Sequence, residues 1–205
     1  MTITWNTKYN YLDPVRVDGP DGRVYSAKGE KLPSVTTILG ATRTKEKEES
    51  LSRWRQKVGE IEADKIRDNA AARGTIMHRI LEGYIKGEGH MDMTDIGQEA
   101  GVMAQNLIDS GFKEAIMDFK QSNKFKKREW IDDYFIQTAA YAVAHNYVYG
   151  SNINSGVILI SVKNGTILKY VSSGKEFQGF MFEWLRRVDL YYKNQASGTK
   201  GPLVV

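Results

Sequence analysis

The sequence contains no cysteine, and it has only three histidines among its 205 residues. Without cysteine there is no disulfide scaffold and no thiolate metal site. A metal ion would need oxygen and imidazole ligands, a set that favours Mg²⁺ or Mn²⁺ over structural zinc. No run approaches eighteen apolar residues, and residues 1–10 lack the basic start and apolar core of a signal peptide. We therefore expect a soluble, cytoplasmic protein that does not enter a membrane.

No charge of one sign dominates, since 29 Lys and Arg stand against 25 Asp and Glu, a formal net charge of +4 at pH 7. This modest excess suits an anionic partner only where the basic residues cluster. Such a basic run consists of Lys124, Lys126, Lys127 and Arg128. We expect these side chains to contact nucleic-acid phosphates, and the alternative is a solvated loop.

The stretch 116–121 reads Ile-Met-Asp-Phe-Lys-Gln, a pattern that favours a strand. In a strand Asp118 and Lys120 would project from one face, about 7 Å apart. The carboxylate could hold a divalent cation while the ammonium group neutralises a phosphate oxygen or orients a water, as phosphodiester hydrolysis requires. The same pair also arises by chance on solvated strands, so alone it does not decide the function.

A helix expected over 130–148 carries Gln137 and Tyr141, an i, i+4 pair that would lie on one face and could point back over the strand. His78 and Glu82 form a second pair at this spacing, and imidazole and carboxylate on one helix face can ligate a metal ion. An ordinary surface pair is the alternative, which we keep for Glu82.

The remaining pattern predicts one α/β domain over 1–205, with a β-rich N-terminal part over 1–30 and a loose tail over 196–205. Ser34 is a suitable N-cap, although the free N–H groups of the following helix could also receive a phosphate. The apolar stripe of the last helix, which includes Phe177, Trp184 and Leu185, is expected to cover the core. Strands are predicted at 23–25, 113–120, 157–162 and 166–171, and Asn164-Gly165 predicts a tight hairpin turn between the last two. Helices are predicted at 35–40, 51–84 (one or two in series), 96–108, 130–148 and 176–194.

Four motifs occur in an order that resembles the RecB-like branch of the PD-(D/E)XK nuclease superfamily, and within it the phage exonucleases related to mitochondrial genome maintenance exonucleases. The resemblance covers most of the chain. It rests on Leu-Pro-Ser-Val-Thr-Thr-Ile-Leu at 32–39, Arg-Gly-Thr-Ile-Met-His at 73–78, Asp-x-Lys at 118–120 and Gln-x-x-x-Tyr at 137–141.

The resemblance implies a short mixed sheet flanked by helices and a Mg²⁺- or Mn²⁺-dependent exonuclease that acts on single-stranded DNA ends, in the host cytoplasm for a phage-encoded protein. The resemblance implies that His78, Asp118 and the backbone carbonyl of Phe119 bind the metal ion. Lys120 would then position the attacking water or stabilise the developing charge. Gln137 and Tyr141 would fix the strand and contact the substrate. Ser34, Thr36 and Arg73 would lie near the nucleic-acid backbone.

One departure from the family is large. There, a preceding strand supplies a first metal-binding Asp in a Gly-x-x-Asp context, and no such motif lies between Gly101 and Asp118. Asp109 and Glu114 are poor replacements. Either the sheet lacks one or two strands or the sequence omits a piece. Two alternatives to the nuclease therefore stay open: a nucleic-acid-binding protein that keeps the fold without catalysis, and an interaction protein in which Asp118 and Lys120 are a solvated pair.

Overall fold

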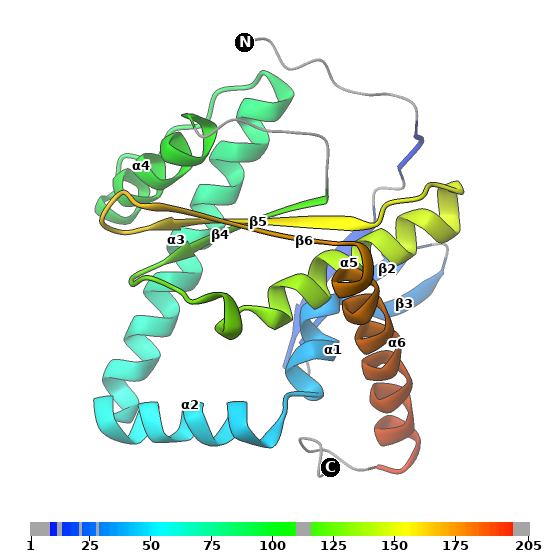
Figure 1. Cartoon of the computed structure of the whole chain (residues 1–205). Coiled ribbons are helices and arrows are strands. Elements are labelled where there is room, and N and C mark those ends of the chain that lie inside the picture. Colours follow the sequence, from blue (N-terminus) through cyan, green and yellow to red (C-terminus); the bar gives the residue numbers. More distant parts are fainter. Residues whose placement is uncertain (1–8, 12–13, 21, 28, 110–115, 199–205) are drawn as a thin grey trace.

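The computed structural model describes residues 9–11, 14–20, 22–27, 29–109 and 116–198 as a mixed α/β protein with two small sheets and six α-helices (Figure 1). The α/β class predicted from the sequence is confirmed. The start of the strand expected over 113–120, with Glu114, and most of the tail expected over 196–205 lie outside these ranges.

The first sheet is an antiparallel meander of β1 (Val15–Gly19), β2 (Gly22–Ala27) and β3 (Glu30–Pro33). It leads into the short helix α1 (Val35–Ala41), which begins where the sequence predicts. Ser34 is its N-cap, and the Ser34 hydroxyl accepts a hydrogen bond from the backbone N–H of Thr37 at 3.0 Å. The cap supplies an acceptor for one of the N–H groups that have no partner within the helix.

The second sheet has the order β4-β5-β6. Strand β4 (Ile116–Ser122) runs parallel to β5 (Ser155–Val162), and β6 (Ile167–Ser173) returns antiparallel to β5. Helix α5 (Asp132–Tyr149) forms the crossover that the parallel pair requires. The tight turn between β5 and β6 contains Gly165 at a φ of 88°, a conformation that favours glycine. The mixed sheet and this turn follow the sequence prediction.

The helical pattern expected over 51–84 is two helices, α2 (Lys45–Val58) and α3 (Glu60–Lys86), separated by Gly59 at a φ of 91°. The predicted start was wrong, because the charged residues before position 51 already belong to α2. This helix buries no residue, so hydrophobic periodicity could not mark where it begins. Helix α4 (Asp95–Asp109) follows the prediction. None of the helices in the described ranges is long and apolar enough to cross a bilayer.

Strand β5 lies at the centre of the core and is buried on both faces. On one face Val157 and Leu159 pack with Met77 and Leu81 of α3 and with α4, including Leu107. On the other face Ile158 and Ile160 pack with Ile131 and with Phe135 of α5. The two helical layers are visible on opposite sides of the sheet (Figure 1). A strand covered on both faces by helices is the usual arrangement around parallel strands.

Helix α6 (Gly174–Ala196) covers the core over only part of its length. Phe177 is fully buried, whereas Leu185 is 51% exposed and Trp184 is half-buried. The prediction that the whole apolar stripe is core was therefore wrong. Farther along the helix, the buried side chain is Arg187, whose guanidinium donates to the backbone carbonyl of Thr42 at the end of α1. This contact fastens α6 to α1 by polar interactions, which a search for apolar residues overlooks.

Phe177 and Phe182 provide a matched pair of truncations on α6. Phe177→Ala should destabilise the protein by about 3–5 kcal/mol, because a fully buried aromatic ring is removed. Phe182 is 73% exposed, so Phe182→Ala should change the free energy of unfolding by less than about 0.5 kcal/mol. Urea unfolding of both variants measures the difference. Equal effects would contradict the packing described for this helix.

Candidate active site

Asp118 and Lys120 lie on the face of β4 that is turned toward α5. The Lys120 ammonium group donates to Asp118 Oδ1 at 2.9 Å and to Gln137 Oε1 at 3.0 Å, so it joins the strand to the helix. Gln137 in turn donates from Nε2 to the Tyr141 hydroxyl at 3.0 Å. The structure thus brings together the two pairs that the sequence singles out, in one connected network.

The Asp118 carboxylate is 7% exposed, and its two oxygens have different surroundings. Oδ2 lies 2.7 Å from Lys120 Nζ, yet within the described residues it has no partner with hydrogen-bond geometry. Burial raises the pKa of Asp118, and the nearby charge and hydrogen bond of Lys120 offset that rise only in part. Lys120 therefore compensates the buried carboxylate only in part, and a second cation beside it would further stabilise its charged form.

His78 of α3 approaches the same strand from another side. Its ring hydrogen-bonds to the backbone of Phe119, and it lies close enough to Asp118 and Lys120 for both charges to affect it. Burial, followed by the positive charge of Lys120, lowers the pKa of His78. A lowered pKa favours the neutral imidazole, which is the form that binds metals.

His78, Asp118 and the backbone of Phe119 are thus gathered in one place, as the resemblance implied. Across the described ranges, however, no group of three or more His, Asp and Glu side chains is placed to hold a metal ion. Within these ranges, protein ligands at this site would be limited to two side chains and the strand backbone. Mg²⁺ sites commonly use one or two carboxylates and complete the shell with waters and substrate phosphates.

The outer edge of β4 lies away from β5. Ser122 accepts a hydrogen bond through its carbonyl from Lys163 beyond the end of β5, and since backbone groups alternate along a strand, those of Met117, Phe119 and Gln121 face the outer edge. In the part of the chain that the structure describes, β4 pairs with β5 alone. Beside this edge, a cavity of about 270 Å³ is lined by Phe119 and by residues of α3 that include His78.

Arg73 is buried within protein contacts and is not presented to solvent, contrary to its expected position along a nucleic-acid backbone. It is 6% exposed, and its guanidinium donates to Gln121 Oε1 at 2.8 and 3.0 Å and to Glu99 Oε2 at 3.0 Å. A further bond reaches Asn123. Arg73 therefore fastens α3 and α4 to the end of the strand that carries Lys120.

The two hydroxyls expected near a nucleic-acid backbone differ in exposure. The Ser34 side chain is buried and caps α1, which was the structural alternative. Thr36 is exposed, and its Oγ1 lies 2.9 Å from Ser34 Oγ.

Some side chains of the basic run are exposed, and others form contacts within the protein. Arg128 binds Asp132 at 3.0 Å, pairs with Glu176 and lies over the ring of Phe135 at 4.0 Å, so it is a structural residue. Lys126 is half-buried, whereas Lys124 and Lys127 are exposed. Only part of the predicted phosphate-binding run is thus open to a ligand.

Tyr134 belongs to the candidate site, although the sequence analysis did not select it. Its ring centroid lies 5.0 Å from Lys120 Nζ, and Asp118 is close enough to contribute to a rise in its pKa that burial mainly causes. The available signal was spacing, because Tyr134 precedes Gln137 by three positions and Tyr141 by seven, which places all three on one helix face.

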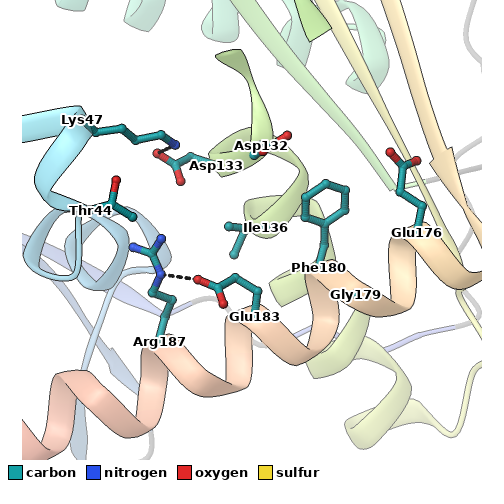
Figure 2. Close-up of a pocket in the computed structure, with 10 residues that line it drawn as sticks. All are labelled: Thr44, Lys47, Asp132, Asp133, Ile136, Glu176, Gly179, Phe180, Glu183 and Arg187. Carbon is teal, nitrogen blue, oxygen red and sulfur yellow. Dashed lines mark hydrogen bonds and ion pairs between the residues drawn. The ribbon is translucent and has the colours of Figure 1, made fainter. Parts of the chain in front are cut away.

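A second cavity, of about 460 Å³, lies between α2, α5 and α6 (Figure 2). Lys47 of α2 binds Asp133 of α5 at 2.6 Å, and this pair attaches the start of α2 to the core. A second pair, Arg187 and Glu183 at 2.6 Å, lies within α6. Hydrophobic periodicity could not reveal this cavity, because its residues come from three separate segments.

No protein-family model matches the chain. The chain is similar to "Mitochondrial genome maintenance exonuclease 1" of Xenopus tropicalis, with 26% identity over 226 residues. The similarity covers 91% of this chain, which spans about 64% of the relative's length. Because the matched length exceeds the 205 residues of the chain, the relative carries residues within this span that have no counterpart here.

Arg73→Ala tests whether Arg73 is structural. We expect a loss of about 3 kcal/mol in unfolding free energy, because the substitution removes one partner of a buried charged cluster. Arg67→Ala on the same helix removes an arginine whose side chain is 60% exposed and should change stability by less than about 0.5 kcal/mol. Chemical denaturation compares the two. An Arg73→Ala protein of parental stability with a weaker salt dependence of DNA binding would support the phosphate-binding role instead.

The exposed lysines of the basic run allow a separate test. The double variant Lys124→Gln/Lys127→Gln should flatten the salt dependence of single-stranded DNA binding by roughly one to one and a half units of slope, since each lost phosphate contact removes about 0.7. A charge-matched double variant, Lys169→Gln/Lys193→Gln, changes exposed residues of β6 and α6 and should keep the parental slope. Fluorescence anisotropy across a salt series measures both. Identical slopes for the two double variants would show that the run is a solvated loop.

Proposed function

We propose that the chain is a metal-dependent exonuclease with a PD-(D/E)XK-type core, which hydrolyses DNA phosphodiester bonds at single-stranded ends. The observation that carries the proposal is the network around Lys120, whose ammonium group is held between Asp118 and Gln137. Similarity to a protein named as an exonuclease supports the nuclease class. DNA is accordingly the proposed substrate, and Mg²⁺ or Mn²⁺ the proposed cofactor.

The donor set suits a weakly held Mg²⁺ or Mn²⁺ ion. Asp118 Oδ2 is buried and ion-paired with Lys120 but makes no hydrogen bond within the described residues. The lowered pKa of the nearby His78 favours the neutral imidazole. These two side chains and the carbonyl of Phe119 would hold the ion. When bound, such an ion polarises a phosphoryl oxygen and lowers the pKa of a bound water. With so few protein ligands we expect Mn²⁺ to bind better than Mg²⁺, because it stands higher in the general affinity order.

The chain's own residues then have distinct roles. Lys120 projects a positive charge beside Asp118, where it can orient the attacking water and stabilise charge that develops on the phosphate. Gln137 holds that ammonium group in place through its carbonyl oxygen. Tyr141, which is 44% exposed, presents its ring and hydroxyl to a bound strand. Burial beneath α5 fixes this geometry before substrate arrives, and such preorganisation makes electrostatic stabilisation effective.

One observation favours a second candidate, a nucleic-acid-binding protein that keeps the nuclease fold with impaired catalysis. Beside His78 and Asp118, the described residues provide no third His, Asp or Glu side chain for a metal ion, and the relative has additional residues within the matched span. Under this alternative the protein binds single-stranded DNA and does not cut it when Mn²⁺ is supplied.

Lys120→Ala distinguishes chemistry from binding. We expect cleavage of a labelled single-stranded oligonucleotide to fall at least about a hundredfold, because a charge aimed at the transition state is lost. The dissociation constant should change only a few-fold, since one cation among several contributes little to ground-state binding. Lys163→Ala, at an exposed position beyond β5, should cut at the parental rate. A Lys120→Ala protein that cuts as fast as the parent would exclude Lys120 from the chemistry.

A further inference from the structure

The first sheet has one face that gathers charge and an aromatic ring. Residues directly opposite one another in an antiparallel pair point to the same side. The register pairs Arg16 with Tyr25, Asp18 with Arg23, and Tyr25 with Leu32. All five side chains therefore lie on one face, while the opposite face carries mainly valines and Lys31.

Two arginines on this face share a single acid. Asp18 binds Arg16 at 2.8 Å and Arg23 at 3.0 Å, and the three side chains are 59%, 51% and 36% exposed, respectively. Two guanidinium groups around one carboxylate leave one uncompensated positive charge. A partly exposed pair of this kind can accept a phosphate at little cost in desolvation.

The position of this face relative to the core is fixed through α1. The Thr37 hydroxyl accepts from the backbone N–H of Arg23 at 3.0 Å and donates to its carbonyl at 2.9 Å. Gly22, at a φ of 111°, lies so close to Thr37 that a Cβ would approach its side chain to 2.8 Å. Strand β2 is thus held against the N-terminus of α1 at one defined point.

Two residues of this face lie within electrostatic reach of the candidate active site. Burial raises the pKa of Tyr141, its hydrogen bond with Gln137 opposes the rise, and Tyr25 and Arg23 exert smaller electrostatic effects on it. Helix α1 provides the packing link, because it contacts both β2 and α5. The first sheet is therefore held near α5 through α1, and its charges act on the site from there.

We propose that Arg23 and Tyr25 form a binding surface for the single-stranded nucleic acid whose end lies at Lys120, with Arg23 on a phosphate and Tyr25 stacked on a base. The charge matches a phosphodiester strand, and the surface lies within electrostatic reach of Tyr141 in the site. Aromatic faces bind bases of unpaired strands, and bases paired in a duplex are not open to such stacking. The surface therefore favours single strands. This inference rests on the proposed function and identifies what the N-terminal sheet contributes to it.

Binding measured in EDTA keeps the test independent of cleavage. Arg23→Gln should weaken the affinity for a fluorescent oligothymidylate several-fold and lower the salt slope by about 0.7. Lys31→Gln removes one charge from the opposite face of the same sheet and should bind as the parent does. Tyr25→Leu should weaken binding on the order of tenfold, whereas Tyr25→Phe keeps the ring and should retain most of the affinity.

Asp18→Asn should change the affinity for the oligonucleotide in the opposite direction. Removal of the shared acid frees both arginines, so binding should tighten several-fold. This variant keeps the test informative even if Arg23→Gln disturbs folding. Parental affinity in Arg23→Gln, Tyr25→Leu and Asp18→Asn would overturn the surface. If the three variants bind like the parent and the parent protein cuts DNA, the proposed function stands and only this inference fails. A parent that neither binds nor cuts overturns both.

Discussion

The structure depends on a carboxylate buried beside an ammonium group. Taking Asp118 out of water costs several kcal/mol unless the charge is compensated, and Lys120 compensates it from two residues away on the same strand. The pair needs a rigid support, which β5 supplies because it is covered on both faces. It also needs neighbours on either side, and these are Gln137 of α5 and His78 of α3. The compensation is incomplete, because burial still raises the pKa of Asp118 despite the nearby ammonium group.

Helix α3 packs on one face of the sheet and also contacts β4 at two points. Arg73 binds the side chain of Gln121, and five residues later on the helix His78 reaches the backbone of Phe119. Both contacts hold the edge beside the catalytic candidates. They also leave a cavity there, in keeping with the extra residues that the relative carries within the matched span.

The elements with strong periodicity could be predicted from the sequence. The apolar runs of β5 and β6, the Asn164-Gly165 turn and the spacing of Gln137 and Tyr141 each have a local physical cause, and the structure follows them. Helix α2 could not be delimited, because a helix that buries nothing has no apolar period. Arg73 and Arg187 were misjudged or missed for a related reason: a buried arginine looks like a surface residue until its partners, 26 to 145 positions away, are known.

A calorimetric titration of Mn²⁺ into the protein and its Asp118→Asn variant tests the central claim most directly, because it asks whether the incompletely compensated carboxylate holds a metal ion. We predict weak binding at a single site in the parent and none in Asp118→Asn, with the variant still folded by circular dichroism. Equal binding by the two proteins, or no binding by the parent at millimolar Mn²⁺, would contradict the account.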